Sequence, residues 1–343
     1  MDRRNFLSAL GIGGFGTLMN KSIGMVRSKE QPLLKPKPLR LGDTIGLVSP
    51  ASIVGDDKEY DNVVKKIRNL GYKVKEAPHA RNKFGYFAGT DKQRAEDLNV
   101  MFADPSVDAI MAFRGGWGCN RILEHLDYGI IREHPKALIG YSDITSLLLA
   151  IYANTGLTTF HGPVGTSTWT KFTMTHFRKA VNSNAPLALE GSSEGASKSY
   201  QPITTLREGR ASGRLLGGNL SVLTSMVGSD YLPDWTGSIL FLEDVGEDVY
   251  RVDRMLTQLK LSGILDQLSG FIFGQCTSCD MADNHRFTLR QILEQHIKPL
   301  KIPAFSGAIF GHIDDMMTLP IGLEVEIESE RGSIIFQEVA TTQ

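Results

Sequence analysis

Short apolar runs alternate with amphipathic segments along the first half of the chain. Five runs have the length and apolar character of buried strands and lie at residues 44–50, 72–74, 107–113, 137–139 and 158–163. Helices are expected between them at residues 57–70, 91–102 and 119–126, and Thr90 with Gln93 forms a capping box before the second. This alternation predicts a parallel sheet with right-handed crossovers.

The pattern changes after residue 165. Residues 166–205 are rich in Ser, Thr, Gly and Pro and show no clear periodicity, which is typical of a crossing between domains. A second series follows, with strands expected at residues 238–242, 270–274 and 323–327 and helices at residues 220–227, 249–259 and 288–297. The sequence therefore predicts an α/β protein. A Rossmann-like parallel-sheet domain at residues 39–165 is followed by a smaller mixed α/β domain, rich in short strands, at residues 206–340.

Residues 1–30 differ in character from the rest of the chain. Arg3 and Arg4 precede Phe6, Leu7 and a glycine-rich apolar segment, and together they resemble a twin-arginine export signal. The apolar segment is too short to span a membrane, so we expect no stable membrane anchor. The alternative is a disordered, basic N-terminus that carries no targeting signal. A Pro-rich linker at residues 31–38 follows, and an exported protein would be mature from between residues 22 and 29, in the periplasm.

Composition limits the classes of ligand. The 343 residues are enough for two domains, and 37 Lys and Arg balance 38 Asp and Glu, which gives no reason to expect nucleic acid as a partner. The three cysteines do not form a disulfide framework. Cys276 and Cys279 are spaced for a small disulfide, whereas a metal site there would need ligands beyond the nearby His285. We expect neither a metal nor a cofactor.

One serine lies at a predicted strand-to-helix turn. Ser142 follows the apolar strand at residues 137–139 and precedes a long apolar helix, which is the position of the nucleophile in many acyl hydrolases. The second glycine of the Gly-x-Ser-x-Gly motif is missing, so a Ser or Asp that caps the helix explains the same letters.

A glycine loop at residues 114–118 follows a neighbouring predicted strand. Parallel strands bring such loops to one edge of the sheet, which makes the loop and Ser142 candidate neighbours in one pocket. The loop lacks the Gly-x-Gly-x-x-Gly pattern of nucleotide-binding sites. Its backbone N–H groups are better suited to an oxyanion hole than to a phosphate.

A serine nucleophile needs a base, and the chain has eight histidines. Six lie in predicted helices or polar loops and are expected at the surface, namely His79, His125, His134, His176, His285 and His296. His161 follows a strand and belongs either to the pocket or to the core. His312 lies between an apolar strand and a polar turn, which makes it the best candidate for the base.

Five motifs occur in the order and spacing of the LD-carboxypeptidases. They lie at residues 114–118, 138–145, 216–220, 242–247 and 311–312, and the resemblance covers residues 38–338. This family of serine peptidases includes muramoyltetrapeptide carboxypeptidase and the microcin C immunity peptidases. The resemblance implies a Ser-Glu-His triad on two domains.

The resemblance also implies a role for each residue of the site. Ser142 is the expected nucleophile, His312 the base and Glu243 the group that orients the base, while the backbone N–H groups of Gly116 and Asp143 are the expected oxyanion hole. Glu243 leaves a predicted buried strand, where an unpaired carboxylate would be costly, and an imidazole partner would remove that cost.

Two further residues are candidates for binding the substrate. Arg114 lies beside the glycine loop, and Trp117 stands where many family members have Tyr. Ile313 follows His312 at a position that is often smaller in the family, so the resemblance predicts the triad more firmly than the shape of the pocket.

The resemblance implies release of a terminal D-amino acid from a peptidoglycan-derived peptide, by hydrolysis of the amide bond to an L-centre. One alternative is that the same triad acts on a peptide-nucleotide antibiotic. A second is a non-catalytic peptide-binding protein that keeps the fold. The sequence also leaves open whether the protein forms a homodimer.

Overall fold

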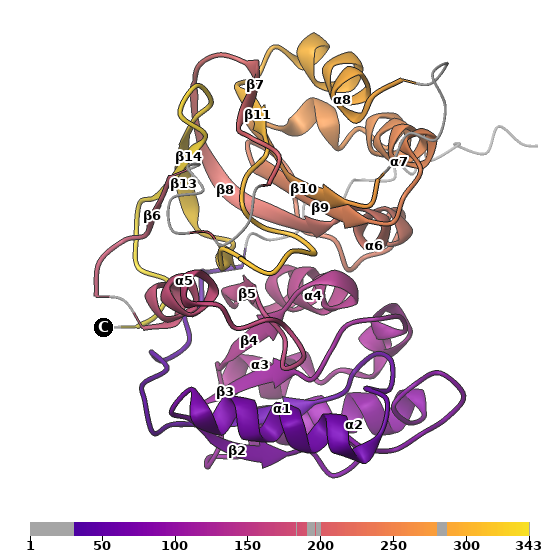
Figure 1. The fold of residues 1–343 in the computed structure, drawn as a ribbon, viewed down its shortest axis with the longest axis vertical. Helices are drawn as coiled ribbons and strands as arrows, with labels where there is room; N and C mark the ends of the chain where they lie inside the picture. Colours follow the sequence, from indigo (N-terminus) through magenta and orange to yellow (C-terminus); the bar gives the residue numbers. More distant parts are fainter. Residues whose placement is uncertain (1–30, 183, 191–195, 197–199, 280–286, 343) are drawn as a thin grey trace, which may run out of the picture. The chain divides into compact units, whose positions relative to one another are not determined.

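Two β-sheets organise the chain (Figure 1). The computed structural model describes residues 31–182, 184–190, 196, 200–279 and 287–342. The predicted export signal and His285 lie outside these residues. The predicted α/β class, with a parallel-rich sheet in the first half and a mixed sheet in the second, is confirmed.

The first sheet has six strands in the order β12-β5-β4-β3-β1-β2. Its strands are β1 (Thr44–Val48), β2 (Lys73–Glu76), β3 (Ala109–Ala112), β4 (Ala137–Gly140), β5 (Thr159–His161) and β12 (Leu319–Ile321). All neighbours run parallel except β12, which is antiparallel to β5. The helices of this half are α1 (Asp57–Asn69), α2 (Asp91–Ala103), α3 (Tyr128–Glu133) and α4 (Thr145–Thr155). Strands β3 and β4 are fully buried, as their uninterrupted apolar sequences predict.

Local signals set the helix boundaries in this half. The capping box of Thr90 and Gln93 forms at the start of α2 as predicted. Helix α1 begins after Asp56, whose side chain accepts a hydrogen bond from the Glu59 N–H, and the chain turns away at Gly71, where φ is +96°. The expected helix at residues 119–126 is a 3-10 helix, Cys119–His125.

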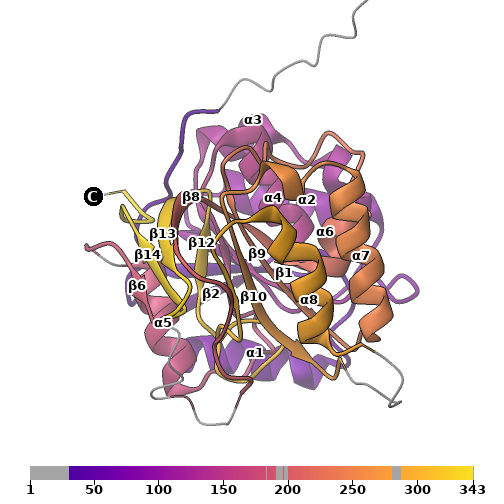
Figure 2. The same ribbon diagram turned by 90° about the horizontal axis from the view of Figure 1, so that it is seen from above.

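The second sheet has eight strands in the order β6-β14-β13-β8-β9-β10-β11-β7. Its strands are β6 (Ala188–Leu189), β7 (Thr204–Arg207), β8 (Arg210–Asn219), β9 (Ile239–Val245), β10 (Gly270–Thr277), β11 (Ala304–Ser306), β13 (Glu324–Glu328) and β14 (Ser333–Phe336). The four central strands, β8 to β11, are parallel, and the outer ones pair antiparallel. Helices α6 (Leu220–Ser225), α7 (Val249–Leu261) and α8 (Leu289–Ile297) accompany this sheet, with α7 and α8 side by side (Figure 2).

Two features of the fold differ from the sequence prediction. The segment predicted as an irregular crossing contains a helix, α5 (Lys171–Val181), which is capped by Thr170 and buries Phe172 and Phe177. The helical period is hard to recognise in the sequence, because the helix is short and follows a run rich in Ser and Thr. The first sheet, whose predicted strands all lie before residue 165, also contains β12 from the C-terminal part of the chain, which pairs with β5.

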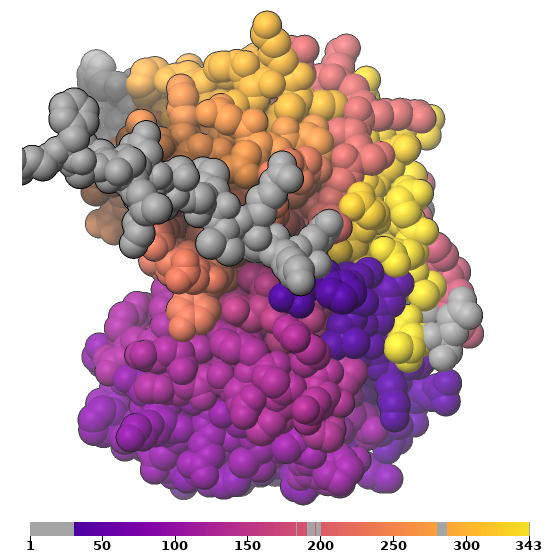
Figure 3. Space-filling model, turned by 180° about the vertical axis from the view of Figure 1, so that it is seen from behind, coloured from indigo at the N-terminus to yellow at the C-terminus, as the bar shows by residue number. Residues whose placement is uncertain are grey.

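The two sheet-bearing halves contact each other beside α4 and α6. The Asn120 side-chain amide donates a 2.6 Å hydrogen bond to the Ser225 hydroxyl, and the rings of Tyr128 and Tyr231 stack with their centroids 6.4 Å apart. Figure 3 shows this region from behind, where the salmon segment after β8 meets the magenta surface of the first half. No helix in the described part of the chain is long and apolar enough to cross a membrane.

Candidate active site

Ser142 lies at a sharp turn between β4 and α4. Its φ is +61°, a left-handed value that non-glycine residues rarely adopt and that is often retained at functional sites. Neither α4 nor the 3-10 turn before it has a side-chain cap, so the capping alternative is not what the structure contains. The Asp143 carboxylate instead accepts a 2.8 Å hydrogen bond from the Cys119 N–H. The Ser142 hydroxyl makes no hydrogen bond to any other described residue.

The glycine loop packs directly against Ser142. A Cβ on Gly115 would lie 2.9 Å from Ser142 Cβ and 3.1 Å from its Oγ, so only glycine allows this approach. Gly116 has a φ of +121°. Within the described residues, the backbone N–H groups of Gly116 and Asp143 donate no hydrogen bond. These two amides remain the candidates for an oxyanion hole.

Glu243 and His312 form a hydrogen-bonded pair. Glu243 lies inside β9 and is fully buried, and His312 Nδ1 lies 2.7 Å from Glu243 Oε2. Burial opposes ionisation of both groups. The hydrogen bond and the opposite charge outweigh it, so that the pKa of Glu243 is lowered and the pKa of His312 is raised. This arrangement fixes the ring, and it leaves Nε2 as the nitrogen that can accept a proton.

Tyr141 joins the two halves of the candidate site. It precedes Ser142 in the chain, and its ring centroid lies 4.9 Å from that of His312. The structure thus brings Ser142, the glycine loop, His312 and Glu243 to one region. A hydrogen bond from Ser142 to His312 is not formed in this conformation, and such contacts often tighten only when substrate binds.

His161 belongs to the core, which resolves the alternative that the sequence leaves open. It is fully buried against Tyr141, Phe241 and Phe310, and neither ring nitrogen has a hydrogen-bond partner among the described residues. Burial lowers its pKa to about 4, so the ring is neutral at physiological pH. Three of the histidines expected at the surface are only partly exposed, namely His79, His176 and His296. His79 pairs with Asp97 at 2.9 Å, and His296 pairs with Asp253 at 2.7 Å.

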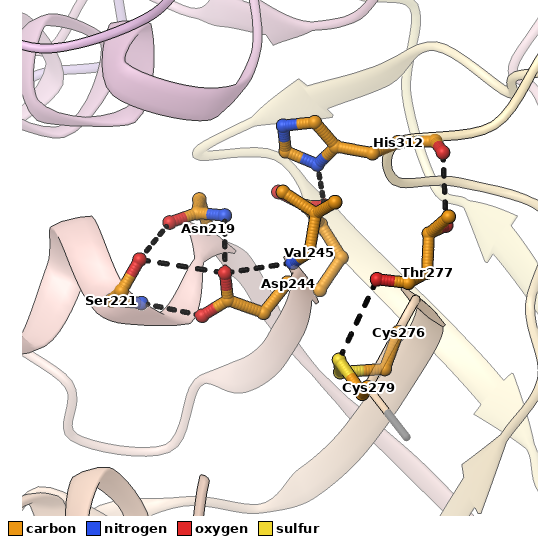
Figure 4. Close-up of a disulfide and its surroundings, with 9 residues drawn as sticks. Asn219, Ser221, Asp244, Val245, Cys276, Thr277, Cys279 and His312 are labelled. Atoms are coloured by element: carbon orange, nitrogen blue, oxygen red, sulfur yellow. Dashed lines mark hydrogen bonds and ion pairs between the residues drawn. A yellow bond between two sulfur atoms is a disulfide. The ribbon is translucent and has the colours of Figure 1, made fainter. Parts of the chain in front are cut away.

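A disulfide lies next to the His312 loop (Figure 4). Cys276 and Cys279 are bonded at the end of β10, and between them the Thr277 hydroxyl donates a 2.9 Å hydrogen bond to the His312 carbonyl. The Cys-x-x-Cys pair is therefore a disulfide that borders the site. No group of three or more candidate metal ligands occurs in the described ranges.

A polar cavity of about 570 Å³ opens beside His312. Its walls include Tyr141, Ser167, Tyr200 and Gln275. Neither Arg114 nor Trp117, the two candidate substrate-binding residues, is among the residues that line it. Arg114 is exposed and donates a 3.1 Å hydrogen bond to the Ile53 carbonyl, and Trp117 is 51% exposed.

A polar network that the sequence does not predict surrounds Asp244, the residue after Glu243 (Figure 4). The Asp244 carboxylate accepts hydrogen bonds from the Ser221 N–H at 2.9 Å and the Asn219 side chain at 3.1 Å. Burial and the neighbouring Glu243 charge raise the pKa of Asp244 to about 6. The Asn219 N–H in turn donates to the Thr145 hydroxyl at 3.0 Å, at the start of α4. This network ties the end of β8 to the helix that follows the nucleophile turn.

Gly218, near the end of β8, packs closely against Thr145 at the start of α4. Its φ is +146°, and a Cβ there would lie 2.6 Å from the Thr145 side chain. We expect Gly218→Ala to lower the free energy of unfolding by about 1–3 kcal/mol more than Gly228→Ala and to reduce turnover. Gly228 is the matched control, because its φ is also positive, at +94°, but a Cβ there meets nothing within 4 Å. Denaturant unfolding and steady-state kinetics measure both effects, and equal losses in the two variants would contradict the packing argument.

Comparison with known proteins decides the family. Models of the LD-carboxypeptidase N-terminal and C-terminal domains match residues 45–162 and 212–327. The chain belongs to the LD-carboxypeptidase family. It is therefore an enzyme, a serine-type carboxypeptidase, as the motifs predict.

Individual LD-carboxypeptidases resemble the chain over nearly their whole length. A probable murein peptide carboxypeptidase of Bacillus subtilis (strain 168) is 36% identical over 304 residues, which cover 88% of this chain and 94% of that protein. The structure of the microcin C7 self immunity protein MccF matches with a TM-score of 0.81 and 30% identity, over 90% of this chain and all of that one. A muramoyltetrapeptide carboxypeptidase from Oxalobacter formigenes matches with a TM-score of 0.76 and 28% identity, over 87% and 100%.

Proposed function

We propose that this LD-carboxypeptidase uses Ser142, His312 and Glu243 as its catalytic triad. The observation that carries the proposal is the 2.7 Å contact of His312 with the buried Glu243, near the left-handed turn at Ser142. In this proposal residues 39–165 form the domain that supplies the nucleophile and residues 206–340 the domain that supplies the acid and the base. Residues 166–205 connect the two domains.

The proposed reaction begins with attack of the Ser142 hydroxyl on the scissile carbonyl. His312 Nε2 takes the serine proton, and the amides of Gly116 and Asp143 donate to the oxyanion that forms. His312 then protonates the nitrogen of the departing amino acid, which leaves an acyl-enzyme on Ser142. A water molecule, deprotonated by His312, hydrolyses the ester. Glu243 stays ionised throughout and stabilises the imidazolium.

The proposed substrate is a peptidoglycan tetrapeptide that ends in D-alanine. The names of the Bacillus and Oxalobacter relatives support it, since both describe carboxypeptidases of murein peptides. Mass spectrometry of the purified enzyme with a tetrapeptide should detect free D-alanine and tripeptide. A pentapeptide should not be trimmed at its D-Ala-D-Ala bond, because the scissile carbonyl there belongs to a D-centre. If the enzyme cleaves the pentapeptide but not the tetrapeptide, the proposed substrate is wrong.

A second candidate function is favoured by the match to MccF. That protein has been solved in complex with aspartyl sulfamoyl adenosine, and its fold covers 90% of this chain. The same triad could hydrolyse an aminoacyl-nucleotide analogue in place of a wall peptide. Parallel assays with aspartyl sulfamoyl adenosine and with tetrapeptide decide between the two, since the preferred substrate should have the higher kcat/KM.

We also propose that the protein is exported to the periplasm, where it would meet wall peptides. The support is the arginine pair followed by Phe6 and Leu7. Replacing Arg3 and Arg4 with Lys should leave the precursor in the cytoplasm, because the export receptor recognises the twin-arginine pair itself. Cell fractionation and immunoblotting measure the distribution. Wild-type protein found only in the cytoplasm would contradict the proposal.

A further inference from the structure

A buried cation lies behind the glycine loop, and the proposed mechanism does not use it. Arg94 belongs to α2 and is 1% exposed. Its Nη1 donates to the Pro50 carbonyl and, at 3.0 Å, to the Gly118 carbonyl at the end of the loop. Its Nη2 pairs with Asp91 at the start of the same helix. A buried charge is costly unless it is paired and hydrogen-bonded, so these contacts are what holds the guanidinium inside the protein.

The peptide bond that receives Arg94 also contacts the residue after the nucleophile. Arg94 donates to the carbonyl of Gly118, and the N–H of the same peptide bond, which belongs to Cys119, donates a 2.8 Å hydrogen bond to the Asp143 carboxylate. Asp143 is 3% exposed. One planar peptide unit therefore lies between a buried cation and a buried carboxylate. We call Arg94, this peptide unit and the Asp143 side chain the peptide clamp.

Both contacts of the peptide clamp involve a charged group. Burial raises the pKa of Asp143, and the Cys119 N–H and the positive charge of Arg94 partly offset that rise. Hydrogen bonds to charged partners are stronger than those between neutral groups. The clamp therefore fixes the plane of the peptide unit more firmly than uncharged contacts would.

The glycine loop needs support from outside. Three of the five residues at 114–118 are glycines, which have the greatest backbone freedom of all residues. A Cβ on Gly118 would lie 2.9 Å from Arg94 Nη1, so the guanidinium packs directly on the loop. Elsewhere in the loop, the Trp117 N–H donates to the Ser52 hydroxyl at 3.1 Å, which is an uncharged contact.

The peptide clamp connects the two candidate oxyanion donors. The first donor, the Gly116 amide, lies two residues before Gly118 in the loop. The second is the amide of Asp143, whose side chain holds that same loop. Oxyanion donors stabilise a transition state only if they are fixed in place before the charge develops. A displacement of about 1 Å can cost on the order of a hundredfold in rate.

We infer that Arg94 and the Asp143 side chain are positioning residues, which fix the glycine loop against the nucleophile turn so that the two amides point at one oxyanion. The inference rests on the proposed function and adds two side chains to it. In this role neither side chain takes part in the bond changes. Loss of the clamp should weaken binding of the transition state but not of the substrate, so kcat should fall while KM stays nearly constant.

The first experiment removes the buried cation. Arg94→Met should lower kcat on tetrapeptide by about 10- to 100-fold and leave KM within about twofold of the wild-type value. Lys136→Met is the matched control, because Lys136 is also buried and donates to two backbone carbonyls, those of Met101 and Asp104. Lys136 precedes β4, whereas Ser142 follows it. Denaturant unfolding should show a loss of stability in both variants, and only Arg94→Met should lose kcat per folded molecule.

The second experiment approaches the same peptide unit from the other side. Asp143→Ala should lower kcat by a similar factor, so it tests the clamp even if Arg94→Met does not fold. The double variant Arg94→Met/Asp143→Ala should lose about as much as either single variant, because both side chains act through one peptide unit. Losses that multiply in the double variant would show that the two side chains act separately, and would overturn the inference.

An inhibitor gives a readout that stability alone does not change. A tripeptide whose terminal carboxyl is replaced by a boronic acid forms a tetrahedral adduct with Ser142, and one adduct oxygen takes the place of the oxyanion. In Arg94→Met its Ki should rise by about the factor by which kcat falls, while the Ki of the plain tripeptide stays within about twofold.

Two further results would overturn the inference and leave the triad intact. One is an equal loss of kcat per folded molecule in Arg94→Met and Lys136→Met, and the other is a loss confined to KM. A wild-type enzyme that cleaves no tetrapeptide would instead refute the proposed function itself.

Discussion

Replacing Ser142 with alanine is expected to reduce D-alanine release by at least about a thousandfold, because the substitution removes the atom that forms the acyl-enzyme. The fold should persist, since the side chain makes no hydrogen bond to other described residues. Mass spectrometry of product and circular dichroism measure the two properties. Substrate binding should survive, which separates loss of chemistry from loss of affinity.

Ser278→Ala is the matched control for this variant. Ser278 also has a left-handed backbone, with a φ of +56°, so both substitutions place alanine in the same strained conformation. The Ser278 variant should keep its turnover. A Ser142→Ala enzyme with near wild-type turnover would contradict the assignment of the nucleophile.

Removing Glu243 should have the second large effect. Glu243→Ala leaves the His312 ring without the group that fixes its tautomer, and we expect a loss on the order of a thousandfold or more in kcat. Glu243→Gln should be milder, because the amide can still accept the hydrogen bond from Nδ1. Steady-state kinetics on tetrapeptide measures both variants, and the Gln variant should not be the weaker of the two.

The pH profile of Glu243→Gln tests the same pair independently of rate. His312 must be neutral to act as a base, so activity falls as the pH drops through the pKa of His312. That pKa is raised in the folded enzyme because the hydrogen bond and charge of Glu243 outweigh the effect of burial. Without the charge the pKa should fall, and the acidic limb of kcat/KM should move to lower pH. An unchanged limb would contradict the role of Glu243.

Local patterns were sufficient for much of the first half of the fold. The apolar runs of β3 and β4 and the capping box of α2 predict elements that the structure contains, because each signal acts within a few residues. The sequence does not predict helix α5, because its Thr and Lys residues are typical of a loop and only the structure shows that Phe172 and Phe177 are buried. The pairing of β12 with β5 joins segments about 160 residues apart, and no local pattern encodes it.

In the candidate site, too, local features can be predicted from the sequence, whereas contacts between distant segments cannot. The turn at Ser142 is visible as an apolar strand followed by an apolar helix. The contact between Glu243 and His312 spans 69 residues, and only the resemblance to a family could indicate it. The link from Asp244 through Asn219 to Thr145 has no sequence signature beyond an acidic residue after a buried strand. Such networks become visible only when three elements are packed together.

The stereochemistry of the leaving residue tests the central claim most directly. An LD-carboxypeptidase must seat the D-methyl group so that the scissile carbonyl reaches both Ser142 and the oxyanion amides. Inverting that centre should displace the carbonyl by about an ångström and reduce the rate on the order of a hundredfold. Mass spectrometry of the enzyme with a tetrapeptide that ends in D-alanine and with its L-alanine epimer makes the comparison. We expect release from the D-epimer and little release from the L-epimer, and equal rates on the two would contradict this account.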